Sequence, residues 1–149
     1  MSWLTAVKRF CISITFGIIF SLLAHAADLK CDVCGMPISE HGCNLVTLSS
    51  SAAGDKPMHV CSPTCAHKLQ KHAPQYSKAE VTDFNHTEKV LTGDKAYFLM
   101  QSSKIKSEMG PNVMAPYAAA FATKEEAEAA KAKYGDGVVV QGSDDAFKK

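Results

Sequence analysis

Arginine is almost absent from this 149-residue chain, in which Arg9 is the only one. Guanidinium groups are the usual bidentate partners of phosphate, so their scarcity argues against nucleotide, phosphoryl and nucleic-acid chemistry. An excess of basic charge is also missing, because 16 Lys and Arg side chains stand against 15 Asp and Glu. Nucleic-acid binders typically carry such an excess. The length predicts one domain or two very small ones.

The first 26 residues have the pattern of a secretory signal peptide. Lys8 and Arg9 precede an apolar run over residues 10–24, and the small-residue motif Ala24-His25-Ala26 follows. A membrane-spanning helix needs about 20 apolar residues, so this run is somewhat short for one. The residue after the motif is not the cysteine of a lipoprotein. We therefore predict a periplasmic protein that is soluble after cleavage; an uncleaved anchor is the alternative.

Residues 27–149 contain five cysteines, namely Cys31, Cys34, Cys43, Cys61 and Cys65. An odd number cannot close into disulfides within one chain. An exported compartment oxidises close, unprotected thiols, and metal ligation is one way to keep them reduced. Disulfides within the pairs Cys31–Cys34 or Cys61–Cys65 are the alternative.

The most specific signal is the segment Cys31-Asp32-Val33-Cys34-Gly35-Met36. Two thiols at this spacing can converge on one ion, with Gly35 relaxing the backbone. Met36 adds a thioether two residues later. Thiolates with thioethers form a soft donor set that prefers Cu(I), whereas Zn(II) favours cysteine, histidine and carboxylate.

A second cysteine pair follows at the end of an expected strand. Cys61 precedes Ser62-Pro63, which predicts a helix start, and Cys65 falls in the first turn. The positive end of that helix is expected to favour the thiolate form. Four cysteines in this arrangement also fit a closed structural zinc site.

The chain alternates short strands with single helices, which predicts an α+β fold of two small sheet-plus-helix (ββα-type) modules packed together. Strands are expected at 44–48, 56–61, 80–84, 95–100, 113–121 and 138–140, and helices at 63–72 and 124–134, the second starting from a capping box between Thr123 and Glu126. The expected modules span residues 27–78 and 79–142. A polar tail, 143–149, is expected to fray.

Residues 31–76 resemble a YHS domain, a small heavy-metal-associated module. The resemblance rests on Val33-Cys34-Gly35-Met36, on Cys61-Ser62 with Cys65, and on Pro74 before Tyr76.

Residues 81–140 resemble the second half of the NosL family, copper chaperones associated with nitrous oxide reductase. The matching motifs are Met109-Gly110-Pro111-Asn112 and Tyr134-Gly135-Asp136-Gly137, and Cys34-Gly35-Met36 also fits the start of that family. The resemblance implies a periplasmic Cu(I)-binding protein. It would hand copper to nitrous oxide reductase, to its membrane assembly and transport machinery, or to another cuproenzyme.

On this interpretation the candidate metal ligands are Cys31, Cys34, Met36, Cys61, Cys65 and Met109. Cys31 and Cys61 are additional to the cysteines of the family pattern, so zinc stays open as the alternative to Cu(I). A second copy of the chain is a further candidate partner. His59 and Met114 are weaker ligand candidates, and Cys43 is expected to be inert.

The sequence presents no assembled nucleophile, base and oxyanion site, so we predict a binding protein and not an enzyme. Two alternatives stay open. Cys31 and Cys34 could form the redox pair of a thiol–disulfide oxidoreductase, although no helix opens there to lower a thiol pKa. All four paired cysteines could instead hold zinc in a structural module for protein interaction.

Overall fold

The computed structural model describes residues 29–39, 45–109, 115 and 117–148. The segment predicted as a signal peptide, together with Cys43 and Met114, lies outside these residues. The elements follow one another in the order β1 (Val46–Ser49), β2 (Met58–Val60), α1 (Pro63–His72), β3 (Lys78–Thr82), β4 (Val90–Thr92), β5 (Tyr97–Met100), η1 (Ile105–Glu108), β6 (Ala118–Phe121), α2 (Lys124–Tyr134), β7 (Val138–Gln141) and α3 (Ser143–Phe147).

The first sheet has four antiparallel strands in the order β2-β1-β3-β4. Val46 in the central strand β1 pairs with Val60 on one side and with Val81 on the other. Val46 and Leu48 are buried while their neighbours are half-buried, so β1 shows the alternation of a strand with one face on a core. Helix α1 packs against β1 and β2.

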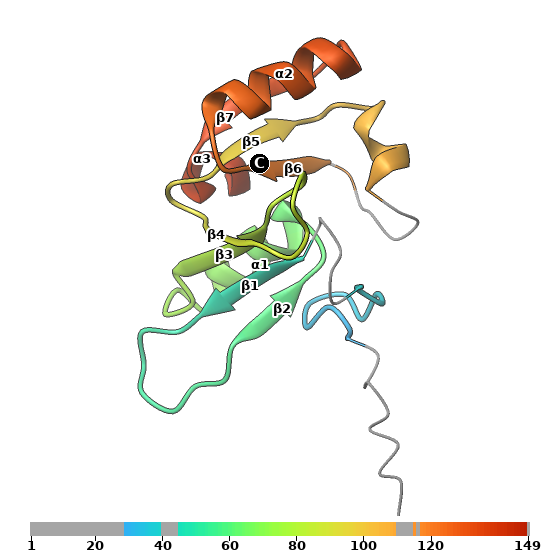
Figure 1. Cartoon of the computed structure of the whole chain (residues 1–149). Helices are drawn as coiled ribbons and strands as arrows, with labels where there is room; N and C mark the ends of the chain where they lie inside the picture. The colour runs from blue at the N-terminus through green and yellow to red at the C-terminus, as the bar shows by residue number, and fades with distance from the viewer. Residues whose placement is uncertain (1–28, 40–44, 110–114, 116, 149) are drawn as a thin grey trace, which may run out of the picture.

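The second sheet has three antiparallel strands in the order β6-β5-β7, and α2 contacts all three (Figure 1). Phe98 in the central strand pairs with Ala120 and with Val140. Ala127 and Tyr134 belong to the buried face of α2. Two small antiparallel sheets with helices make an α+β fold, which confirms the predicted class.

Both long helices begin as their sequence predicts. The Ser62 side chain accepts a hydrogen bond from the Cys65 backbone N at 3.2 Å, with Pro63 at the first helical position. At α2, Thr123 and Glu126 form a reciprocal capping box. Gly135 ends that helix in the left-handed conformation, with φ 78°.

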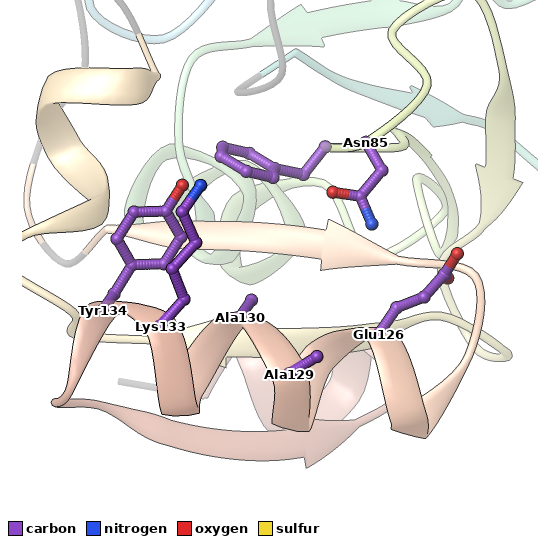
Figure 2. Close-up of a pocket in the computed structure, with 7 residues that line it drawn as sticks. Asn85, Glu126, Ala129, Ala130, Lys133 and Tyr134 are labelled. Carbon is purple, nitrogen blue, oxygen red and sulfur yellow. The ribbon is translucent and has the colours of Figure 1, made fainter.

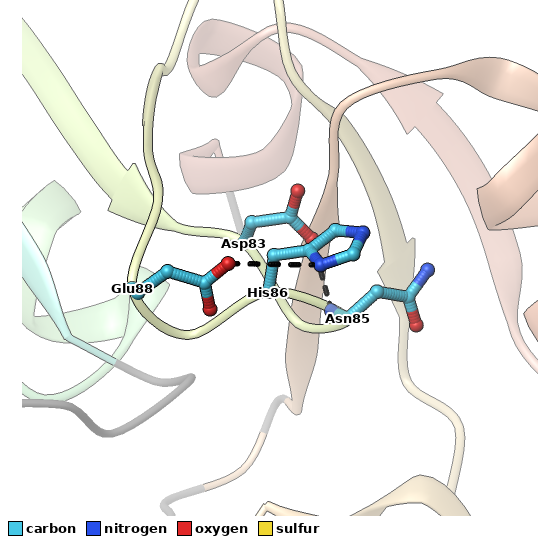
Figure 3. A network of polar contacts seen from close by, with 4 residues as sticks. All are labelled: Asp83, Asn85, His86 and Glu88. Atoms are coloured by element: carbon cyan, nitrogen blue, oxygen red, sulfur yellow. Dashed lines mark hydrogen bonds and ion pairs between the residues drawn. The ribbon is translucent and has the colours of Figure 1, made fainter.

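The first sheet extends to Thr92, beyond the module boundary predicted at residue 78, because β3 pairs with β1 and β4 with β3. The turn between β3 and β4 also contacts the second sheet. Phe84 N donates to the carbonyl of Ala120 at 2.8 Å. Figure 3 shows this turn, where the buried Asp83 carboxylate accepts a hydrogen bond from Asn85 N at 2.9 Å.

The C-terminal segment differs from the predicted frayed tail, because Ser143–Phe147 forms α3. Ala146 and Phe147 are buried in the first core cluster, which also contains Val46, Leu48 and Val81 of the first sheet. The rings of Phe147 and Phe98 meet edge to face, with centroids 6.0 Å apart. Both sheets and α3 therefore contribute to this first core cluster. In the part of the chain described, none of the helices has the length and apolarity needed to cross a membrane.

Candidate metal centre

Residues 29–38 form a tight loop, which we call the knuckle. Ile38 N donates to the carbonyl of Leu29 at 2.7 Å, and Cys31 N donates to that of Met36 at 2.8 Å. Gly35 N in turn donates to the carbonyl of Cys31 at 2.8 Å. Gly35 has φ +73°, a conformation that glycine adopts without steric cost. The glycine therefore lets the loop turn back after Cys34.

The second cysteine pair lies where β2 passes into α1. Cys61 directly follows β2, and Cys65 lies in the first turn of α1 with its backbone N held by the Ser62 cap. Their Sγ atoms are 3.8 Å apart. Strand, cap and helix thus fix two thiols on rigid elements.

The knuckle brings the other two thiols to this pair. The Sγ atoms of Cys31, Cys34, Cys61 and Cys65 all lie within 4.8 Å of one another. We call these four residues the thiol cluster. Four thiolates around one zinc ion at about 2.3 Å would be separated by about 3.8 Å, so the cluster has the dimensions of a single-ion site. All four cysteines are thiols outside any disulfide, so neither disulfide alternative is present.

Asp32 docks the knuckle on β2, which is an edge strand of the first sheet. Its backbone N donates to the carbonyl of His59 at 2.8 Å, and its carboxylate accepts a hydrogen bond from His59 N at 2.6 Å. The knuckle, blue in Figure 1, therefore lies beside β2. Asp32 was not among the residues predicted from the sequence to take part in the site. An acceptor side chain between two ligand cysteines is the signal that could have identified it.

The His59 ring has a different role from metal ligation. Its Nδ1 lies 3.1 Å from the Thr47 hydroxyl of the neighbouring strand. The ring therefore has a cross-strand hydrogen-bond partner, and His59 is not a member of the thiol cluster.

The environment of Cys31 favours its thiolate. Burial raises the pKa of this thiol, but hydrogen bonds from the backbone N–H groups of Cys34, Val33 and Cys61 lower it more. The net effect is a pKa below the ordinary value for cysteine. Backbone donors directed at sulfur are a common support for a metal-bound thiolate.

The other two buried thiols have raised pKa values. Burial raises the pKa of Cys61 well above its ordinary range, and the Cys34 thiol and the charge of Cys31 add to this effect. Burial likewise raises the pKa of Cys65, and the hydrogen bond from Ser62 does not offset it. The expected thiolate stabilisation at the start of α1 is therefore outweighed by desolvation and by a neighbouring like charge.

The two predicted thioether ligands have different positions. Met36 is half-buried and packs against the core cluster that contains Cys31, Cys61 and Cys65. Met109 is 5% exposed and belongs to the second core cluster, with Leu99, Ile105 and Phe121. It follows η1, whose buried residue Ile105 belongs to the same cluster. Met36 thus packs against the core cluster to which three of the thiols belong, whereas Met109 belongs to the second core cluster.

A hollow of about 240 Å³ lies along α2, and none of its lining residues is a cysteine (Figure 2). It is lined by Phe84, Asn85, Glu126, Ala129, Ala130, Lys133 and Tyr134. Glu126 already closes the capping box, and the Lys133 amine lies 4.9 Å from the centre of the Tyr134 ring. Both charged groups are thus engaged, and the chemistry of the described residues is concentrated in the thiol cluster.

Comparison with known proteins gives a family. No curated protein matches the sequence significantly. Among solved structures, the copper chaperone NosL from Shewanella denitrificans matches with a TM-score of 0.60 and 21% identity, over 76% of this chain and 86% of that one. This likeness establishes the shared fold. The sequence model of the NosL family matches residues 23–144, and the chain therefore belongs to the NosL family.

Proposed function

We propose that this protein binds Cu(I) in its thiol cluster and delivers it to a cuproenzyme. The observation that carries the proposal is the convergence of four cysteine Sγ atoms within 4.8 Å in a NosL fold. Thiolates are soft ligands that suit Cu(I). The solved relative is described as a copper chaperone. Membership of the NosL family makes the chain a binding protein rather than an enzyme.

Delivery is the second part of the proposal. The signal-peptide pattern of residues 1–26 supports export, and family membership supports nitrous oxide reductase or its membrane assembly machinery as the recipient. Release requires no catalytic step. An incoming sulfur ligand can bind the ion before a protein ligand leaves, so copper passes on by ligand exchange.

Binding is tested by anaerobic titration of residues 27–149 with Cu(I) against bicinchoninate, whose copper complex absorbs visible light. We expect the wild type to withdraw Cu(I) from the chelator, and Cys61→Ser and Cys65→Ser to lose at least about tenfold in affinity. A thioether contribution is tested by Met36→Leu, with Met100→Leu as the control from the same core cluster. Copper affinity that is unchanged in both serine variants would refute the site.

Zinc is the second candidate because the cluster also has the dimensions of a closed tetrahedral site. On that alternative the purified protein holds one tightly bound zinc ion, and Met36→Leu leaves the zinc affinity unchanged. A thiol–disulfide oxidoreductase has less support, because a redox pair needs two thiols whereas the structure brings four Sγ atoms within 4.8 Å. In addition Cys31, the thiol whose pKa is lowered, is only 3% exposed.

Delivery is tested by mixing the Cu(I)-loaded protein with copper-free nitrous oxide reductase and its assembly machinery in membranes. We expect copper to appear in the reductase at a rate above that from free Cu(I) at the same concentration. Equal rates from the two sources would contradict this recipient.

A further inference from the structure

The four thiols differ sharply in their access to solvent. Cys31, Cys61 and Cys65 are 3%, 0% and 2% exposed, whereas Cys34 is an exposed residue. The three buried thiols belong to the first core cluster. An incoming ligand can therefore reach the cluster through Cys34 without displacing core side chains.

The backbone supports the same asymmetry. Cys61 and Cys65 are fixed by β2 and by the capped first turn of α1. Cys34 lies in the turn of the knuckle, next to Gly35, where an added Cβ would have no atom within 4 Å. The space beside Cys34 is thus open on the side of the turn.

We infer that Cys34 is the exchange ligand of the thiol cluster, through which the metal ion enters and leaves, while Cys31, Cys61 and Cys65 form a buried three-thiol seat. This inference rests on the proposed function. In the exchange step a sulfur atom of the acceptor forms a bond to Cu(I), and the bond from Cu(I) to Cys34 breaks. If the acceptor is a thiol, its proton passes to the released Cys34 thiolate, and copper remains Cu(I).

The geometry also defines the chemistry of the partner. The acceptor must present a thiolate or thioether on a projecting segment, because a recessed sulfur could not reach the exposed side of the cluster. Once its sulfur has replaced Cys34, the ion is held by one partner ligand and three buried ligands. Complete transfer then requires further acceptor sulfurs to replace these in turn.

The first test compares single variants, each in a Cys43→Ser background so that only the cluster thiols vary. Copper affinity is measured against bicinchoninate, and the transfer rate to bathocuproine disulfonate by stopped flow. We expect the copper affinity of Cys34→Ser to remain at least about tenfold higher than that of Cys61→Ser or Cys65→Ser. We expect it to transfer copper at least about tenfold faster than the background protein, because its first bond is already absent.

The second test needs no cluster variant, so it holds even where a buried serine prevents folding. Copper-loaded Cys43→Ser protein is treated with iodoacetamide for increasing times, unfolded, and cleaved before aspartate. The fragments 28–31, 32–54 and 55–82 then separate Cys31, Cys34 and the Cys61/Cys65 pair. We expect the fragment with Cys34 to be alkylated first, and the singly alkylated protein to retain its copper.

The outcomes separate the two proposals. Failure of the wild type to bind Cu(I) refutes the proposed function and this inference with it. Copper binding with equal loss of affinity in the Cys34, Cys61 and Cys65 variants, or alkylation that begins at Cys61 or Cys65, refutes the exchange role of Cys34 alone.

Discussion

The Sγ atoms of Cys34 and Cys61 lie 3.5 Å apart, although the two residues are 27 positions apart in the sequence. This contact joins the knuckle to the end of β2, and it involves the one exposed thiol of the cluster. In the absence of metal, two thiols this close are a natural pair for oxidation.

We predict that diamide, a two-electron thiol oxidant, joins Cys34 and Cys61 in the metal-free protein and abolishes Cu(I) binding. Each thiol gives up one hydrogen to diamide, which is reduced to its hydrazine as the disulfide forms. In a Cys43→Ser background, cleavage before aspartate then yields fragments 32–54 and 55–82 joined to each other by this disulfide. Fragment masses before and after reduction measure this linkage, and fragmentation of the linked peptide distinguishes Cys61 from Cys65.

Copper-loaded protein serves as the control and should resist diamide, because both sulfurs are then ligands. A link from fragment 28–31 to fragment 32–54 as the main product would mean that Cys31 and Cys34 pair instead, contrary to this prediction.

Asp32→Ala should weaken metal binding although Asp32 is not a ligand. The substitution removes the carboxylate that accepts from His59 N at 2.6 Å, so the knuckle is held less firmly on β2. Loss of a group that orients metal ligands typically costs about 10- to 100-fold in affinity. Chelator competition with Cu(I) measures the change.

Asp32→Asn is the matched variant, because its amide oxygen can still accept the hydrogen bond from His59 N. Its affinity should return to within about threefold of the wild type, a difference of less than about 1 kcal/mol. A defect as large in Asp32→Asn as in Asp32→Ala would show that the carboxylate acts by its charge and not by positioning.

Gly137→Ala should destabilise the fold. Gly137 has φ +99°, and an added Cβ would lie 2.7 Å from the carbonyl oxygen of Met100. Gly54→Ala is the control, since Gly54 has φ +91° but no atom within 4 Å of an added Cβ. We expect the free energy of unfolding to fall by about 1–2 kcal/mol in Gly54→Ala, from backbone strain alone, and by more than about 3 kcal/mol in Gly137→Ala. Urea unfolding measures both losses. Equal losses at the two sites would contradict a steric clash at Gly137.

The free energy of unfolding should fall in acid, partly because the Asp136 carboxylate becomes protonated. Hydrogen bonds from the Ser102 and Ser103 hydroxyls and from Ser103 N lower the pKa of this carboxyl to about 2 from an ordinary 3.8. A depressed folded-state pKa gives stability that is fully present above the unfolded value, and that is lost as the pH falls from about 4 to about 2. The free energy of unfolding at each pH measures it. Asp136→Asn should flatten this part of the profile, and a profile of unchanged slope would contradict the prediction.

The sequence predicted the elements that depend on local signals. The Ser62-Pro63 start and the Thr123–Glu126 capping box place α1 and α2 correctly, because caps act within a few residues of the chain. Two cysteine pairs beside predicted turns also identified the thiol cluster. Spacing alone could not show that Cys34 is the exposed member.

The elements that the sequence did not predict depend on distant contacts. Strand β4 is a short edge strand with Val90 exposed, so it lacks the alternation that marks a half-buried strand. The segment of α3 was predicted as a polar tail. Its burial depends on the contact of Phe147 with Phe98, which lies far away in the sequence. Met109 was predicted as a ligand from its motif; its burial in the second core cluster depends on contacts that the motif does not show, and its role as a ligand stays a prediction.

The central claim is that the thiol cluster selects cuprous ion. The most direct measurement offers the reduced, metal-free protein one equivalent each of Cu(I) and Zn(II) without oxygen, and then quantifies both metals that remain bound after gel filtration. We predict close to one copper per chain and little zinc. Retention of zinc with copper left in solution would contradict the proposed function.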